Sequence, residues 1–109
     1  MPNLKVYVDR DLFDRRQGPI VAALAALRDV LCAGMKVTPD QAQLVIVPVH
    51  GLPDQPLVNI EFNYLAKPDR DRATVIAVCE GLRRVMAPAA GTHVAVRATA
   101  LEPSFIALK

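Results

Sequence analysis

The sequence predicts a single α+β domain over residues 1–109, in which a four-stranded mixed sheet carries two helices on one face. A strand–helix–strand pattern of hydrophobicity occurs twice, and the second copy begins near the middle of the chain. Three of the four predicted strands alternate apolar and polar residues, so their apolar residues share one face. With 52% apolar residues, the chain has enough material for a core and for a further buried surface between subunits.

The first strand–helix–strand unit begins at the N-terminus. Residues 2–9 alternate as a half-buried strand does, and Asp11 is the expected N-cap of the following helix. Gly34 stands where a left-handed residue is expected to end that helix. The apolar residues between these limits recur at helical spacing: Ile20, Leu24, Leu27 and Leu31.

A short β-branched run, residues 44–49, predicts the second strand. Both faces of this strand are apolar. Pro48 within it indicates a position at the edge of the sheet, because proline cannot donate to a ladder. Residues 51–56, which contain a glycine and two prolines, predict a loop before the pattern repeats.

The second unit has the same order as the first. Residues 58–64 alternate strictly and predict the third strand. Asp69 is the expected N-cap of the second helix, which Pro88 and Gly91 are expected to end. Residues 92–99 alternate again and complete a β-α-β-β-α-β order.

Composition excludes several classes of protein. The net charge of +2 comes from 13 basic and 11 acidic residues that are interleaved, which does not favour nucleic-acid binding. No run of about 18 apolar residues predicts a membrane span, and charges near the N-terminus argue against a secretory signal, so a cytoplasmic location is expected. Cys32, Cys79, His50 and His93 lack the spacing of a disulfide framework or a metal site, and no metal is expected.

The alternation also predicts a mixed face of the sheet, on the side away from the helices. Such a face can contact water or can line the interior of an oligomer, and the surplus of apolar residues leaves both interpretations open. It is expected to carry the polar residues of three strands: Lys5, Tyr7, Asn59, Glu61, Asn63, His93, Arg97 and Thr99.

Pro2 is the candidate catalytic residue. Removal of Met1 would make Pro2 a free secondary amine at the start of a strand. Such an amine can take a proton from carbon when an apolar pocket and nearby cations lower its pKa. The structural alternative is that the first residue of a strand tolerates proline, because no ladder donor is lost there.

The length, the order of elements and the Met1-Pro2 start resemble the tautomerase superfamily, in particular macrophage migration inhibitory factor and 5-carboxymethyl-2-hydroxymuconate isomerase. The sequence departs from the inhibitory-factor branch at Arg97 and Thr99, where that branch has Tyr and Asn. Besides Pro2, three segments are similar to segments of the family. Gly34-Met35-Lys36 resembles a Gly-Lys step, and Tyr64-Leu65-Ala66-Lys67 resembles an Ile-Gly-Lys segment. Leu101-Glu102-Pro103-Ser104-Phe105 resembles a Leu-His-Pro region.

This resemblance implies a homotrimer with active sites at subunit boundaries and Pro2 at the base of each pocket. It implies a cofactor-independent isomerase that moves a proton in a keto–enol or dienoate reaction on a small carboxylate substrate, with Pro2 as the general base. The alternative is a non-catalytic ligand-binding or oligomeric protein, because ferredoxin-like domains share the same order of elements.

Four further residues are candidates for substrate binding. Arg97 can hold a carboxylate in a bidentate fork, or can form a salt bridge with Glu61 in the interior of an oligomer. Lys36, which the resemblance places towards the active site, can equally complement the end of the first helix. Arg70 can contact substrate or remain solvated, and Tyr64 can reach the pocket rim or pack in the core.

Overall fold

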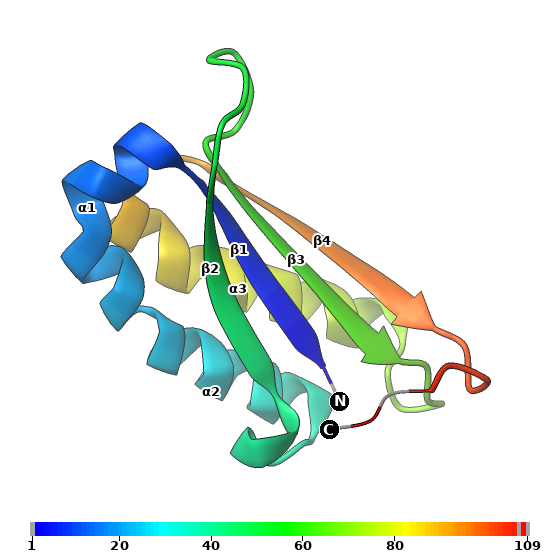
Figure 1. Ribbon diagram of the computed structural model, residues 1–109. Coiled ribbons are helices and arrows are strands. Elements are labelled where there is room, and N and C mark those ends of the chain that lie inside the picture. The colour runs from blue at the N-terminus through cyan, green and yellow to red at the C-terminus, as the bar shows by residue number, and fades with distance from the viewer. Residues whose placement is uncertain (1, 107, 109) are drawn as a thin grey trace.

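Figure 1 shows the computed structural model, which describes residues 2–106 and residue 108. The elements follow the chain in the order β1 (Asn3–Asp9), α1 (Arg10–Ala22), α2 (Leu24–Met35), a 3-10 turn η1 (Pro39–Gln41), β2 (Gln43–Val49), β3 (Val58–Leu65), α3 (Arg72–Ala90) and β4 (Val94–Leu101).

The four strands form one mixed sheet with the order β2-β1-β3-β4. β1 pairs with β2 and β3 pairs with β4 in parallel, whereas β1 and β3 are antiparallel. Each parallel pair is joined through helices, because parallel neighbours need a crossover connection. β2 is an edge strand, so the position predicted for Pro48 is confirmed. The loop of residues 50–57 projects beyond the sheet (Figure 1).

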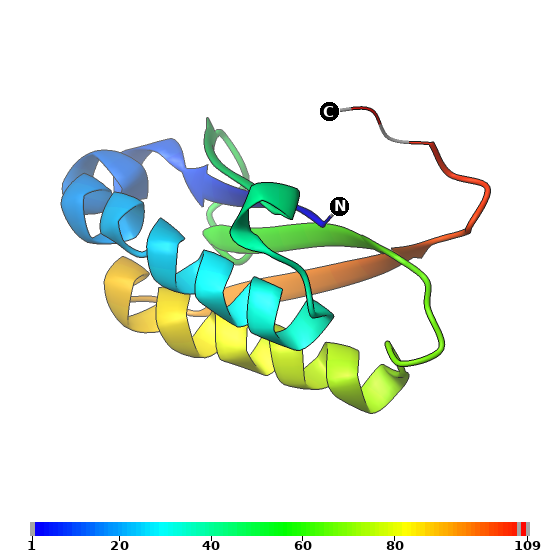
Figure 2. The ribbon, with the colours of Figure 1, turned by 90° about the horizontal axis from the view of Figure 1, so that it is seen from below.

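All three helices cover one face of the sheet, and the other face is open (Figure 2). The predicted apolar face and its mixed counterpart are therefore confirmed, except that β4 begins at Val94, so His93 lies just before the strand. Alternate strand residues are fully or almost fully buried beneath the helices: Leu4, Val6, Val8, Val58, Ile60, Phe62 and Val94. The helices contribute the other half of the core: Ile20, Leu27, Leu31, Met35, Val78, Leu82 and Met86.

The first predicted helix is two helices, so the sheet carries three rather than two. The axes of α1 and α2 differ by 56°. Arg16 also leaves the helical conformation inside α1, with φ −130° and ψ 28°. Arg16 lies three residues before Pro19, which cannot donate a backbone hydrogen bond and whose ring crowds the preceding turn. No helix in the described part of the chain is by itself long and apolar enough to cross a membrane, and α1 and α2 meet that criterion only as a bent pair.

Both predicted N-caps are wrong by two residues. Asp9, not Asp11, caps α1 and accepts the backbone N–H of Leu12 at 3.2 Å. Asp71, not Asp69, caps α3 and accepts the backbone N–H of Thr74 at 2.8 Å. In each case the capping carboxylate accepts the backbone N–H of the residue three positions later in the chain.

The predicted helix ends are partly wrong. Gly34 lies inside α2, and Lys36 is the left-handed residue that ends it, with φ 56° and ψ 53°. Gly34 instead allows α2 to approach α3, because a Cβ atom there would overlap the Cγ2 methyl of Val78. Pro88 lies inside α3, which continues to Ala90, whereas Gly91 ends the helix in a left-handed conformation as expected.

Candidate functional site

Pro2 is buried at the start of β1. Its carbonyl oxygen accepts the backbone N–H of Gln43 at 3.1 Å, so the beginning of β2 holds it in place. The antiparallel register sets the next residue, Asn3, opposite Asn63 near the end of β3. Met1, whose removal the catalytic hypothesis requires, lies outside the residues that the structure describes.

Pro2 lines a cavity of about 240 Å³ at this end of the sheet. On one side the cavity presents a row of three amide side chains, which are register neighbours across β2, β1 and β3: Gln43, Asn3 and Asn63. On the other side it is lined by apolar residues from the end of β4 and the segment that follows: Leu101, Phe105, Ile106 and Leu108. The lining residues that the structure describes are all uncharged.

The segment after β4, residues 102–106 and 108, is called the tail below. A turn in which the backbone N–H of Phe105 donates to the carbonyl of Glu102 at 2.9 Å directs it back over the sheet end. It runs on the side away from the helices, towards the start of β1 (Figure 2). Its apolar side chains are largely in contact with solvent: the exposed fractions of Phe105, Ile106 and Leu108 are 53%, 80% and 93%.

The sequence does not predict this lining. Alternation places Asn63 on the mixed face but does not link it to Pro2, because it leaves the pairing partner of Asn63 in β1 undetermined. The three amides share a signal that could have found them: each is the polar residue nearest the end of a strand that lies beside Pro2. The return of the tail carries no such periodic signal.

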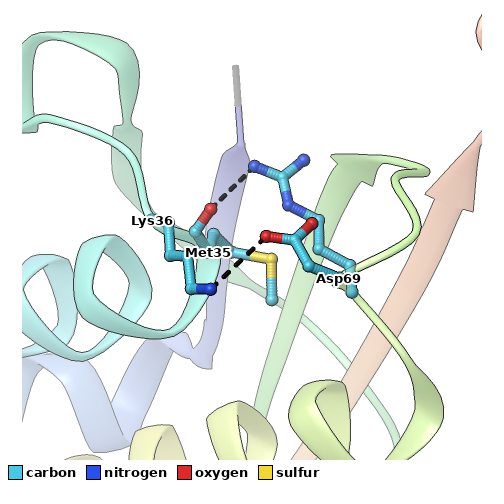
Figure 3. Close-up of polar contacts among 4 residues, drawn as sticks. Met35, Lys36 and Asp69 are labelled. Atoms are coloured by element: carbon cyan, nitrogen blue, oxygen red, sulfur yellow. Dashed lines mark hydrogen bonds and ion pairs between the residues drawn. The ribbon is translucent and has the colours of Figure 1, made fainter.

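Lys36 and Arg70 come together where α2 ends. The Nζ of Lys36 lies 3.5 Å from the Asp69 carboxylate, and the two side chains are 74% and 50% exposed (Figure 3). The guanidinium of Arg70 donates from Nη2 to the carbonyl of Met35 at 2.8 Å and from Nη1 to the carbonyl of Leu65 at 2.7 Å. Its Nε is buried and has no hydrogen-bond partner within the described residues. Arg70 therefore joins the end of α2 to the end of β3, at the same end of the sheet as Pro2.

Arg97 lies in a different part of the structure. It is on the open face, in register with Glu61 of β3, and the two side chains are not within salt-bridge distance of each other. Arg97 lines a second cavity of about 310 Å³, which does not include Pro2. The other residues around it come from β1, β2, β3 and the loop that precedes β3: Tyr7, Val49, Gln55, Pro56, Asn59 and Glu61.

Tyr64 lies on the helix-covered face. Its side chain is buried, with 9% exposed, and its ring centroid lies 6.0 Å from that of Phe62 at an interplanar angle of 39°. Within one chain, the structure therefore brings Lys36 and Arg70 close to each other, but neither these two residues nor Arg97 and Tyr64 line the Pro2 cavity.

The two cysteines and the described His, Asp and Glu residues give no sign of a thiol centre or a metal centre. Burial raises the pKa of the Cys32 and Cys79 thiols, so both remain protonated at neutral pH. Both side chains are half-buried rather than fully buried. No group of three or more His, Cys, Asp or Glu residues that could hold a metal ion occurs in residues 2–106 and 108.

Comparison with known proteins identifies the fold. No family model matches the sequence, and no curated protein matches it significantly. Solved structures do match: a fused 4-OT asymmetric trimer has a TM-score of 0.71 at 15% identity, covering 97% of this chain and 91% of that one. Macrophage migration inhibitory factor of Toxoplasma gondii has a TM-score of 0.73 at 8% identity, covering 97% and 95%.

A third solved structure is that of a protein inactivated by 2-oxo-3-pentynoate. It has a TM-score of 0.72 at 11% identity and covers 97% of this chain and 90% of its own. These likenesses extend over nearly the whole chain, and they show that it has the tautomerase-superfamily fold.

Proposed function

We propose that this protein is a cofactor-independent tautomerase or isomerase. Pro2, freed by removal of Met1, acts as the general base in a keto–enol or dienoate proton transfer on a small carboxylate substrate. The observation that carries the proposal is the placement of Pro2: it is buried at a cavity that combines amide groups with an apolar wall. The tautomerase-superfamily fold of the chain supports the same reaction class.

The base in this reaction is the secondary amine of Pro2. An α-amino group has a reference pKa of about 7.7–8.0, and burial disfavours its charged form and so lowers the pKa. The neutral amine takes a proton from the carbon beside a substrate carbonyl, and the resulting ammonium returns that proton to a different atom of the enolate. No bond to the enzyme is formed, and no oxidant or cofactor is consumed.

The enolate oxygen that develops during this step needs hydrogen-bond donors. The amide side chains of Asn3, Gln43 and Asn63 each carry an NH₂ group and line the cavity beside Pro2. We expect Asn63 and Gln43 to be the principal donors, because each stands in register with Asn3, the residue that follows Pro2.

The substrate carboxylate requires a cation, and three candidates remain. Lys36 and Arg70 lie at the Pro2 end of the sheet, and the exposed ammonium of Lys36 has donors left beside its ion pair with Asp69. Arg97 would act only across a subunit boundary, because it lines a different cavity of its own chain. We propose a homotrimer on this ground and by analogy with the fused 4-OT trimer, with Arg97 of one chain near Pro2 of the next.

The first experiment tests Pro2. The mass of the intact protein is expected to show that Met1 is absent, and ketonisation of the enol of phenylpyruvate is then followed by absorbance. Pro2→Ala is expected to lower kcat/KM by about 10²–10⁴-fold, the usual contribution of a general base. Leu52→Ala, in the distant and exposed loop, is the control and is expected to retain full activity. Equal activity of the wild type and Pro2→Ala would refute the mechanism.

A chemical probe tests the same amine independently of turnover. The alkyne of 2-oxo-3-pentynoate is conjugated to a ketone, so a neutral amine adds to it without a leaving group. One molecule of reagent is expected to attach to each chain and to increase its mass by the full mass of the reagent. Peptide mapping is expected to place this label on the N-terminal peptide. Labelling of Pro2→Ala at the same rate and position would contradict a reactive Pro2.

Complementation tests the role of Arg97. Pro2→Ala and Arg97→Met are each expected to lose activity, the second through a raised KM for carboxylate substrates. When the two variants are unfolded and refolded together, mixed trimers should contain some boundaries where an intact Pro2 meets an intact Arg97. Recovery of activity is the expected result. An unchanged KM for Arg97→Met would remove Arg97 from substrate binding and leave Lys36 to be tested by Lys36→Met.

The second candidate function is ligand binding without chemistry. One observation favours it: none of the candidate cations lines the Pro2 cavity within the described part of a single chain. Saturable binding of 2-oxo acids with no turnover, in a protein shown to lack Met1, would favour this function over the first.

A further inference from the structure

The second cavity, on the open face of the sheet, shares no lining residue with the Pro2 cavity. It is lined by Tyr7 near the end of β1, by Asn59 and Glu61 of β3, and by Arg97 of β4. Tyr7 follows Pro2 by five residues of extended chain, which places it about 16 Å from Pro2. The cavity volume of about 310 Å³ falls at the lower end of the range of small-molecule sites, about 300–1,000 Å³.

This cavity contains one positive and one negative side chain. Glu61 and Arg97 stand in register on the neighbouring strands β3 and β4, but neither forms a salt bridge within the described residues. Lys5 of β1 is in register with Glu61 on its other side and does not line the cavity. The charges that line the cavity therefore sum to zero, and each is free to pair with a charge on a ligand.

The rest of the lining provides hydrogen-bonding groups and an apolar surface. The side-chain amide of Asn59 donates to the carbonyl of Pro56 at 3.0 Å, which holds the loop against β3. The amide oxygen of Asn59 is an acceptor, and the hydroxyl of Tyr7 can donate or accept. The ring of Tyr7, together with Val49 and Pro56, supplies apolar surface beside these polar groups.

Only a ligand with two opposite charges suits both ionised side chains. A carboxylate alone at Arg97 brings a second negative charge near Glu61, and an amine alone at Glu61 brings a second positive charge near Arg97. A zwitterion pairs with both, and the guanidinium can hold its carboxylate in a bidentate fork. In an α-amino acid the two charged groups share one carbon, which suits side chains on strands about 4.8 Å apart.

We propose that this cavity is a binding site for a zwitterionic α-amino acid with an apolar side chain. Arg97 holds the carboxylate, Glu61 accepts from the ammonium group, and the apolar surface beside Tyr7 contacts the ligand's side chain. The site goes beyond the proposed function, because it does not need the amine of Pro2. A bound amino acid occupies the guanidinium of Arg97, so it competes with any carboxylate substrate that Arg97 serves in a neighbouring chain.

Three ligands with the same hydrocarbon skeleton test the need for both charges. Leucine carries both, 4-methylpentanoate carries only the carboxylate, and 3-methylbutylamine carries only the ammonium group. In titrations of ¹⁵N-labelled protein, leucine is expected to shift the backbone amide resonances of Tyr7, Asn59 and Glu61. It should bind at least about fivefold more tightly than either analogue, a difference of about 1 kcal/mol. Equal affinities, or shifts confined to residues around Pro2, would overturn the proposal.

Variants of the two charged residues identify their roles. Glu61→Gln should weaken leucine binding at least about threefold and tighten binding of 4-methylpentanoate, because it removes the like charge near that carboxylate. Arg97→Met should weaken both of these ligands and tighten binding of 3-methylbutylamine. Both residues are exposed, so neither substitution should prevent folding. Glu80→Gln, the same loss of charge on α3, is the control and should change none of the affinities. An unchanged leucine affinity in Glu61→Gln would overturn the proposal.

Further measurements separate this site from the proposed function and from a subunit interface. Pro2→Ala should bind leucine with wild-type affinity, and a loss of binding in that variant would overturn the proposal. Absence of saturable leucine binding to the assembled wild-type protein would do the same, because another copy would then cover this face. Leucine should raise KM for the enol of phenylpyruvate without lowering kcat. If leucine bound in the manner that depends on Glu61 and Arg97 while KM was unchanged, Arg97 would be excluded from substrate binding and the amino-acid site would stand.

Discussion

Gly34→Ala is expected to destabilise the protein although alanine is the better helix former. Gly34 lies inside α2 and faces α3, and a Cβ atom there would overlap the Cγ2 methyl of Val78. Val78 is buried and β-branched, so it has essentially one χ1 rotamer in a helix and cannot turn away. The two helices must therefore separate to accommodate the new methyl group.

The expected magnitude is the difference of two effects. Alanine in place of glycine favours a helix by about 0.8–1.0 kcal/mol, whereas an extra methyl group in a well-packed core costs about 1–3 kcal/mol. Because the overlap is severe and the neighbour is stiff, the upper half of that range applies. A net loss of about 1–2 kcal/mol follows, and each kcal/mol lowers Tm by roughly 4–8 °C in a domain of this size.

Substitution of two other glycines provides a comparison for Gly34→Ala. Gly81 is the counterpart on α3, and a Cβ atom there would lie 2.8 Å from Cγ1 of Val30, a milder overlap with a side chain that is also β-branched but only half-buried, so Gly81→Ala should cost less than Gly34→Ala. Gly18 has open space around it beyond its chain neighbours, but it precedes Pro19, whose ring crowds a Cβ atom on the preceding helical residue, so Gly18→Ala should leave the stability near that of the wild type. Denaturant unfolding followed by circular dichroism should place Gly18→Ala near the wild type and Gly34→Ala below it.

A double-mutant cycle with Val78 identifies the cause. Val78→Ala removes the methyl group that the new Cβ would overlap, so Gly34→Ala should cost less in that background by at least about 1 kcal/mol. If the two effects were additive, or if Gly34→Ala were as stable as Gly18→Ala, the close approach of α2 and α3 would not be the constraint and the reasoning would be refuted.

Two further predictions concern the helix ends. Arg16 donates to the carbonyls of Ala89 and Pro88 at 3.0 and 3.1 Å, so Arg16→Met should lower the free energy of unfolding by about 1–2 kcal/mol in denaturant titrations, and an unchanged value would contradict this role. The hydrogen bond from the Thr74 backbone N–H holds the pKa of Asp71 below its ordinary 3.8, so the cap's contribution is present above that pH and is lost as the pH falls through the lowered pKa. Asp71→Asn caps without titrating, and it should therefore lose less stability on acidification than the wild type; parallel pH curves would contradict this.

The fold could be predicted because alternation in a strand fixes which residues share a face. Phe62 and Ile60 are buried beneath the helices while Glu61 and Asn63 lie on the open face, as the alternation requires. The two β-α-β connections also limit how the strands can pair, and each unit does form a parallel pair. The layers of the fold are thus a long-range consequence of a local pattern.

The helix boundaries were predicted less well because neighbouring residues compete for the same role. Asp9 and Asp11 are equally good caps by sequence, and only the backbone geometry at the end of β1 decides between them. Glycine is a residue typical of a helix end, but at Gly34 the close packing of α2 against α3 is what requires it. The left-handed conformation then falls on Lys36, a residue that propensity alone would not select.

The candidate site was predictable only as far as it depends on the start of β1. Pro2 is set by its place in the sequence, and the fold buries it at a cavity. The walls of that cavity come from strand pairing and from the tail, neither of which has a local signal. Arg97 shows most clearly what the sequence leaves undetermined. Its guanidinium suits a carboxylate, but within its own chain it lines a different cavity from Pro2. If Arg97 acts on substrate, its partner must be the Pro2 of another copy, and the assembly rather than the chain is then the unit that holds the complete site.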